Sequence, residues 1–233
     1  MKKTIGILGG MGPLATCDLM NKIISRTDAA CDQEHLHICV DCNTNIPDRT
    51  AAILRGGKNP VEEMTKSAVA LEKMGAELIL VSCNTAHYFV PQVQQSISVP
   101  ILHMPEETAK YMAEKGVRCA GILATDGTVQ SRIYHMALEK FGITPLQPDT
   151  EDQKLIMTLI YDYVKAGKPI DLGEEVLAMC QRLQKAGAEM MILGCTELPI
   201  VFDQLKLSVP TVDPTDVLAT TAIRLAGGRV KKS

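Results

Sequence analysis

The chain of 233 residues has a formal net charge of −3, a hydrophobic fraction of 46%, no Trp, three Phe and five Tyr. It is long enough to bury one large or two small cores, built from aliphatic side chains and Met. The scarcity of aromatic residues and of surplus positive charge argues against nucleic acids and anionic membranes as partners, and no apolar stretch approaches the ~20 residues of a membrane span. A small molecule is the expected partner.

The first predicted strand covers residues 4–8 and is followed by a glycine turn and a helix beginning at Pro13. The turn interrupts the apolar run before it reaches the length of a signal peptide, which favours a buried strand and a cytoplasmic protein with reduced cysteines. The segment GMGPLA at 10–15 fits a loose dinucleotide fingerprint. Because Asp41 lies far beyond the ~20-residue spacing of a ribose-binding acid, a turn that lets another anion approach backbone N–H groups is favoured over a nucleotide site.

Cysteine and histidine residues gather around the second predicted strand, residues 36–42, and on composition alone could form a zinc site: Cys31, His35, His37, Cys39 and Cys42. Period-two alternation sends Cys39 and Cys42 to opposite faces of that strand. Closed zinc sites usually draw their cysteines from tight turns. We therefore expect no metal and interpret these residues as ordinary core and surface positions.

The segment NTNIPDR at 43–49 leaves the carboxyl end of the second strand, where ligands of open α/β sheets bind. Arg49 could offer a bidentate fork to a carboxylate there, although most surface arginines are simply solvated. An amphipathic helix over 61–74 leads into the strand that ends at Cys83, and residues 98–102 are predicted as a short buried strand. The first lobe ends near residue 103.

The second half of the chain repeats the first. Residues 118–125 mirror residues 3–10, and the offset between matched positions falls steadily, from 115 at the first strand to 112 at two cysteines and 110 at the following Val-Pro pair. The elements predicted in this half are helices over 126–140, 151–165 and 173–186, strands over 143–146 and 209–212, and a last helix over 214–225 that returns to the first lobe. The prediction is an α/β protein of two duplicated, pseudo-symmetric lobes with parallel strands, residues 1–103 plus 213–233 and residues 104–212, with the active site in the cleft between them.

Two apolar runs end at a cysteine, LILVSCNTAH at 78–87 and MMILGCTELP at 190–199, and both follow the residues GAE. Cys83 and Cys195 are therefore equivalent positions. On opposite walls of one cleft, the two thiols would suit inversion of an α-carbon: one thiolate removes the proton and the opposite thiol returns one. A helix starting directly after each cysteine would lower the pKa of the thiol, and Thr85 and Thr196 could cap those helices or bind substrate. The alternative is that both cysteines are small buried hydrophobic residues.

The segments GILGGMGPLAT at 6–16, VSCNTAH at 81–87 and GCTEL at 194–198 resemble the aspartate/glutamate racemase superfamily, and most closely its aspartate racemase branch. The resemblance extends along essentially the whole chain. It implies a cofactor-independent, usually dimeric amino-acid racemase of acidic substrates, with Cys83 and Cys195 as acid/base residues. The substrate-binding residues it implies are Asn84, Thr85 and Thr196 for the amino-acid core, Glu197 beside the amino group, Thr125 after the repeated strand, and Arg49 with Lys165, or Lys168 three residues on, for the acidic side chain.

In the glutamate racemase branch the first strand is typically followed by Asp-Ser, whereas this chain has Gly9-Gly10, which favours aspartate as substrate. Both thiols are present, so the chain does not resemble the one-cysteine relatives that decarboxylate malonates. The alternative within enzymes is racemisation or isomerisation of another small acid, such as glutamate, a hydantoin or maleate. From another class, the alternative is a small-acid binding protein with inert thiols.

Overall fold

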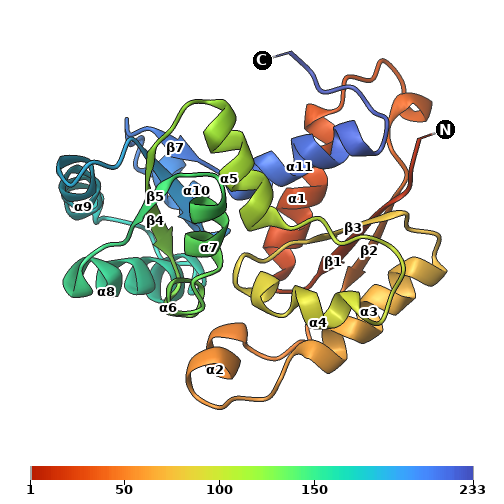
Figure 1. Cartoon of the computed structure of the whole chain (residues 1–233), viewed down its shortest axis with the longest axis horizontal. Coiled ribbons are helices and arrows are strands. Elements are labelled where there is room, and N and C mark those ends of the chain that lie inside the picture. Colours follow the sequence, from red (N-terminus) through yellow and green to blue (C-terminus); the bar gives the residue numbers. More distant parts are fainter. Residues whose placement is uncertain (1, 233) are drawn as a thin grey trace. The chain divides into compact units, whose positions relative to one another are not determined.

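The structure is a computed structural model that describes residues 2–232 and divides into two compact units. One unit comprises the residues up to 107 together with those from 215 onward, and the other comprises residues 108–214. Each contains a parallel sheet, with strand order β2-β1-β3 in the first and β5-β4-β6-β7 in the second (Figure 1). The predicted α/β class with parallel strands in two units is therefore confirmed.

The first unit begins with strand–helix–strand and ends with the last helix of the chain. Its elements are β1 (Ile5–Gly9), α1 (Pro13–Arg26), a 3-10 turn η1 (Asp32–Glu34), β2 (Ile38–Cys42), α2 (Arg49–Leu54), α3 (Val61–Lys73), β3 (Leu78–Val81), a 3-10 turn η2 (Thr85–Tyr88), α4 (Val90–Gln94), the start of α5 (Met104–Glu114), and α11 (Pro214–Leu225).

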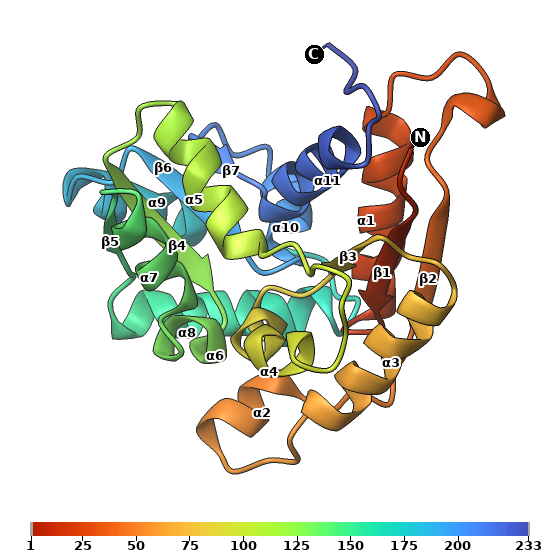
Figure 2. The same cartoon turned by 45° about the vertical axis from the view of Figure 1, so that its right-hand side comes forward.

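Side chains of the first sheet alternate between two cores. Helices α1 and α11 and helices α3 and α4 belong to the same unit as this sheet (Figure 2). Ile5 and Ile7 pack in the core formed with α1 and α11, whereas Leu8 and Val81 pack in the core formed with α3 and α4. All four side chains are buried, and each such residue contributes roughly 1.5–3 kcal/mol by leaving water. Burial on both faces explains why these strands are continuous apolar runs in the sequence.

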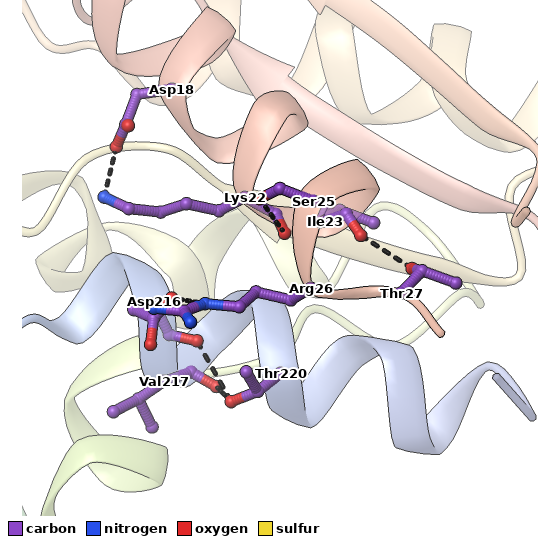
Figure 3. Close-up of polar contacts among 9 residues, drawn as sticks. All are labelled: Asp18, Lys22, Ile23, Ser25, Arg26, Thr27, Asp216, Val217 and Thr220. Atoms are coloured by element: carbon purple, nitrogen blue, oxygen red, sulfur yellow. Dashed lines mark hydrogen bonds and ion pairs between the residues drawn. The ribbon is translucent and has the colours of Figure 1, made fainter. Parts of the chain in front are cut away.

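An ion pair joins α11 to α1 although the two helices lie at opposite ends of the sequence (Figure 3). Nε of Arg26, the last residue of α1, donates to Oδ1 of Asp216 at 2.8 Å. Within α11, Oγ1 of Thr220 donates to the backbone carbonyl of Asp216 at 3.0 Å. The C-terminal helix therefore completes the first unit.

The second unit repeats the strand–helix pattern. Its elements are the remainder of α5, β4 (Cys119–Ala124), α6 (Asp126–Gln130), α7 (Ile133–Lys140), β5 (Thr144–Leu146), α8 (Thr150–Thr158), a π-helical segment η3 (Leu159–Val164), α9 (Gly173–Lys185), β6 (Met190–Gly194), α10 (Leu198–Gln204) and β7 (Thr211–Val212).

The short strand predicted over 98–102 is reduced to one parallel bridge between Ile79 and Ile101. The N–H groups of Ser98 and Val99 donate to Oε1 of Glu72, at 2.7 and 3.1 Å, instead of to a neighbouring strand. The next residue is proline, which has no N–H to donate. A strand ladder cannot extend through residues whose donors are used elsewhere or missing.

The helices predicted over 126–140 and 151–165 are both interrupted. Arg132 separates α6 from α7 and adopts a left-handed φ of 58°. In the second case α8 passes into η3, and the N–H of Lys165 donates to the carbonyl of Ile160, five residues earlier, at 3.0 Å. This wider turn changes the direction in which Lys165 leaves the helix, compared with an unbroken α-helix.

Candidate active site

The carboxyl ends of β1 and β3 are neighbours in the first sheet because the two strands pair in parallel. Thr16 of α1 connects them. Its Oγ1 accepts a hydrogen bond from the N–H of Gly10 at 2.9 Å, donates to the carbonyl of Gly12 at 3.0 Å and lies 3.2 Å from Oγ of Ser82. The glycine turn is thereby held beside the residue that precedes Cys83.

Gly9, the last residue of β1, and Gly10, directly after it, have no room for side chains. A Cβ at Gly9 would overlap the side chain of Thr16, and a Cβ at Gly10 would overlap the backbone of Asn43. Gly10 also has φ of +89°, a conformation that L side chains rarely adopt. The packing of this turn therefore requires Gly-Gly at the position where the glutamate racemase branch is expected to carry Asp-Ser.

Cys83 and the two residues after it lie together at the end of β3, and Cys83, Asn84 and Thr85 are all buried. The 3-10 turn η2 begins at Thr85, so this threonine lies inside the turn and does not cap it through its side chain. The capping role considered for Thr85 is therefore wrong. Its place beside Cys83 keeps it a candidate for binding substrate.

Arg49 is half-buried at the start of α2 and contacts the glycine turn. Its Nη1 donates to the carbonyl of Pro47 at 3.0 Å, and its Nη2 donates to the carbonyl of Met11 at 3.4 Å. Because Met11 follows β1, this contact places the guanidinium at the same edge of the sheet as Cys83. An arginine here is suited to bind a carboxylate.

In the second unit, Cys195 follows β6 and belongs to a group of polar side chains around Glu197. Sγ of Cys195 donates to Oε2 of Glu197 at 2.9 Å, and Oγ1 of Thr196 donates to the same oxygen at 3.0 Å. Nζ of Lys165 donates to Oε1 at 2.5 Å and lies 5.8 Å from the ring centre of Tyr161. Glu197 therefore connects the thiol to an ammonium group.

The charges and hydrogen bonds around Glu197 determine the protonation states of Glu197 and Cys195. Burial raises the pKa of Glu197, but the charge of Lys165 and the hydrogen bonds from Cys195, Lys165 and Thr196 outweigh it and hold that pKa below its ordinary value. Burial, followed by the charge of Glu197 and the hydrogen bond to it, raises the pKa of Cys195 well above its ordinary value. At neutral pH the pair is a carboxylate that accepts a hydrogen bond from a protonated thiol.

The prediction that a helix start lowers the thiol pKa is wrong for Cys195. Helix α10 begins only at Leu198, whose N–H donates to the carbonyl of Cys195 at 3.0 Å, and Thr196 donates to Glu197 instead of capping the helix. The carboxylate of Glu197 occupies the position next to the sulfur. A negative charge beside a buried thiol disfavours the thiolate more than the partial charge of a helix end favours it.

Thr125 lies at the same edge of the second sheet as Cys195, because β4 and β6 pair with Ala124 opposite Gly194. Thr125 caps α6, and its Oγ1 accepts a hydrogen bond from the N–H of Thr128 at 3.4 Å. A pocket of about 730 Å³ opens between α6, residues 147–150 and α8. Its lining starts at Asp126, directly after Thr125, and includes neither Thr125 nor Cys195.

The two lysines considered for the acidic side chain differ in their surroundings. Both are exposed, but Nζ of Lys165 donates to Glu197, whereas the side chain of Lys168 makes no such contact within the described part of the chain. The family resemblance implies that Glu197 lies beside the substrate amino group, but it does not indicate the contacts of Glu197 with Cys195 and Lys165. The GCTE spacing brings Glu197 near the thiol, but nothing in the sequence indicates that a π-turn directs Lys165 to it.

Among residues 2–232, no group of three or more His, Cys, Asp or Glu could hold a metal ion. At the position of the zinc alternative, Nε2 of His37 lies 4.0 Å from Sγ of Cys39, while Cys31 and Cys42 are exposed. No helix in the same part of the chain has both the length and the apolar character to cross a membrane.

The fold and these residues define a duplicated α/β protein with one thiol at an equivalent strand end of each unit. The profile of the Asp/Glu/hydantoin racemase family matches residues 8–222. The chain therefore belongs to this family and is an amino-acid racemase, which confirms the resemblance found in the sequence.

Individual relatives agree with this assignment. The chain is 31% identical to the broad-specificity amino-acid racemase RacX of Bacillus subtilis (strain 168), over 94% of this chain and 96% of RacX. It is similar to the structure of Picrophilus torridus aspartate racemase, with a TM-score of 0.80 and 30% identity over 98% of this chain and 96% of that one. A glutamate racemase from Francisella tularensis, crystallised with D-glutamate, shares the fold alone, with a TM-score of 0.68 and 17% identity over 96% of this chain and 81% of that one.

Proposed function

We propose that the chain interconverts L- and D-aspartate without a cofactor and that Cys83 and Cys195 carry the protons. The observation that supports this most directly is the equivalence of the two thiols. β3 pairs with β1 and ends before Cys83, and β6 pairs with β4 and ends before Cys195, so each thiol follows the same strand of the same topology. A pair of equivalent acid/base groups is what inversion at carbon requires.

In the proposed reaction, Glu197 accepts the proton of Cys195, and the resulting thiolate removes the α-proton from one enantiomer. The C–H bond breaks, an S–H bond forms on Cys195, and the electron pair stays on the α-carbon, conjugated with the substrate carboxylate. Cys83 then donates its S–H proton to the opposite face of that carbon. In the reverse direction the thiolate left on Cys83 removes the α-proton, the S–H of Cys195 protonates the opposite face, and Glu197 returns its proton to the sulfur of Cys195. The proposal requires one substrate to contact both thiols.

The choice of an acidic amino acid is supported by a cationic side chain near each thiol. Arg49 lies at the strand edge that carries Cys83, and Lys165 is linked to Cys195 through Glu197. Both cations can bind the second carboxylate of such a substrate, since guanidinium and ammonium groups bind carboxylates strongly. We therefore propose that Arg49 and Lys165 bind the side-chain carboxylate, with Asn84, Thr85, Thr125 and Thr196 holding the amino-acid core.

The test is incubation with L-aspartate in D2O without pyridoxal phosphate. The expected product is D-aspartate with deuterium on the α-carbon. Cys83→Ser and Cys195→Ser should each abolish racemisation, whereas Cys180→Ser, at a buried free cysteine of α9, should retain it. Absence of both racemisation and α-deuterium exchange with aspartate would reject the proposal.

A racemase of wider substrate range is the second candidate. The similarity to a broad-specificity racemase favours it. A panel of acidic, polar and apolar amino acids would separate the candidates. Arg49→Leu should raise the KM for aspartate and leave apolar substrates unchanged if the acidic side chain is recognised at this position.

We also propose that the racemase is a homodimer. Exposed apolar side chains on α1 support this, since such side chains are favourable to cover: Leu14, Met20 and Ile24. Sedimentation of the wild type and of Leu14→Glu would test it, with a dimer expected only for the wild type. The cytoplasmic location expected from the sequence stays a prediction.

A further inference from the structure

His87 is a buried residue to which the proposed reaction assigns no role. It lies in η2, four residues after Cys83, and its side chain is 1% exposed. Its Nδ1 lies 2.8 Å from the carbonyl oxygen of Cys83, and its backbone N–H donates to the carbonyl of Asn84 at 3.1 Å. The ring contacts His103 edge to face, with centroids 5.2 Å apart. The ring and the backbone N–H of His87 therefore both contact the turn that carries the thiol of Cys83.

The protonation state of His87 follows from its surroundings. Burial, and to a lesser degree the neighbouring His103, lower the pKa of His87 to about 3, so the ring is neutral at physiological pH. A neutral imidazole has one N–H, and a carbonyl oxygen can only accept. Nδ1 must therefore carry the hydrogen and donate to Cys83.

The equivalent turn after Cys195 is built differently. There the carbonyl of the cysteine accepts a hydrogen bond from the backbone N–H of Leu198, at 3.0 Å, and the residue four positions on is Pro199, which has no side-chain donor. Both copies of the motif carry the thiol, but the carbonyl of the cysteine accepts from a backbone N–H in the second copy and from a histidine side chain in the first. The hydrogen bond from His87 is a local feature of the Cys83 turn.

We propose that His87 is a positioning residue for Cys83: its Nδ1–H holds the carbonyl of Cys83 and thereby fixes the backbone from which the thiol projects. The inference rests on the proposed two-thiol racemisation. Fixing a carbonyl fixes ψ of its residue, and ψ sets the direction of the Cα–Cβ bond relative to η2. Since reacting atoms must be placed to a fraction of an ångström, a rotated Cys83 loses proton transfer on its own face of the substrate.

This role predicts an asymmetric defect. Because the equilibrium constant of racemisation is one, kcat/KM is equal for the two enantiomers in every variant and cannot report the asymmetry. Exchange of the α-proton without inversion can report it. An enzyme with a misplaced Cys83 still exchanges the enantiomer that Cys195 deprotonates, but no longer the enantiomer that Cys83 deprotonates.

The experiment compares three variants by α-deuterium exchange of each enantiomer of aspartate in D2O. His87→Gln moves the donor by one bond, and we expect at least a tenfold loss of exchange for one enantiomer relative to the other, matching the pattern of Cys83→Ala and not that of Cys195→Ala. His87→Asn places an amide N–H close to the position of Nδ1 and should stay within about threefold of the wild type. His135→Gln, at a buried histidine of α7, controls for loss of a buried ring and should affect both enantiomers equally or not at all.

Equal losses for both enantiomers in His87→Gln, activity of that variant within threefold of the wild type, or a loss in His87→Asn as large as in His87→Gln would each overturn the inference. If His87→Gln does not fold, His87→Ala takes its place with the same expectations. Mass-spectrometric mapping of iodoacetamide labelling supplies a readout that needs no turnover: the alkylation rate of Cys83 should change at least threefold in His87→Gln, with that of Cys195 within twofold. If the wild type exchanges no amino acid, the proposed function fails, and the labelling result alone decides the role of His87.

Discussion

Replacing Glu197 by Gln tests whether this carboxylate accepts the proton of Cys195 or only raises the pKa of the thiol. Gln keeps an acceptor for Cys195 and Thr196 but removes the negative charge. The side chains of Glu197 and Lys165 are 12% and 35% exposed. Two unit charges 4 Å apart interact by about 4 kcal/mol at an effective dielectric constant of 20, and screening and desolvation leave about 1–2 kcal/mol of net stability to be lost.

The substitution should have opposite effects on turnover and on thiol acidity. Loss of a positioned base lowers the rate by about 10²–10⁴. The pKa of Cys195 should fall at the same time, because the charge of Glu197 and the hydrogen bond to it are two of the causes that raise it, while burial keeps it above the ordinary value. The alkylation of Cys195 should therefore reach half its maximal rate at a lower pH in Glu197→Gln than in the wild type.

Deuterium exchange and the pH profile of Cys195 alkylation, measured on the same preparations, decide the question. A variant that racemises as fast as the wild type or faster, with a more acidic thiol, would show that Glu197 only raises the thiol pKa. Thermal unfolding gives a further check. The pKa of Glu197 is lowered in the folded state, so its contribution to stability is present above its unfolded pKa of about 4.3 and is lost as the pH falls through the folded value. The difference in Tm between wild type and Glu197→Gln should therefore shrink in acid.

Two further substitutions test the lysine assignment and the glycine turn. Lys165→Met should lower kcat/KM for aspartate by tenfold or more because it removes the cation next to Glu197, and Lys168→Met, at the exposed neighbour, should not; equal effects in a racemisation assay would contradict the assignment. Gly10→Ala should destabilise the fold by at least about 2 kcal/mol in urea titrations, since its φ is +89° and its Cβ would overlap the backbone of Asn43. Gly12→Ala, where no atom lies within 4 Å of the added Cβ, should change stability by less than about 0.5 kcal/mol.

The strands that position the thiols could be predicted because they are buried on both faces and therefore appear as short apolar runs. The helix predicted over 214–225 is confirmed as α11, with Pro214 at its start and Gly227 after its end. The interruption at Arg132 could not be predicted, because neither Gly nor Pro marks it. The π-turn before Lys165 likewise depends on five-residue hydrogen bonds that have no sequence signature.

The sequence by itself determined the α/β class, the duplication and the equivalence of Cys83 and Cys195. The spacing of apolar residues and the offsets between matched positions of the two halves are properties of the chain alone. Only the tertiary structure decided what surrounds each sulfur. Glu197 beside Cys195, Lys165 beside Glu197 and the ring of His87 on the carbonyl of Cys83 depend on distances of 2.5–2.9 Å between side chains and their neighbours. Such distances depend on where helices turn and how side chains pack, and these in turn determine whether the thiol of Cys195 holds or releases its proton.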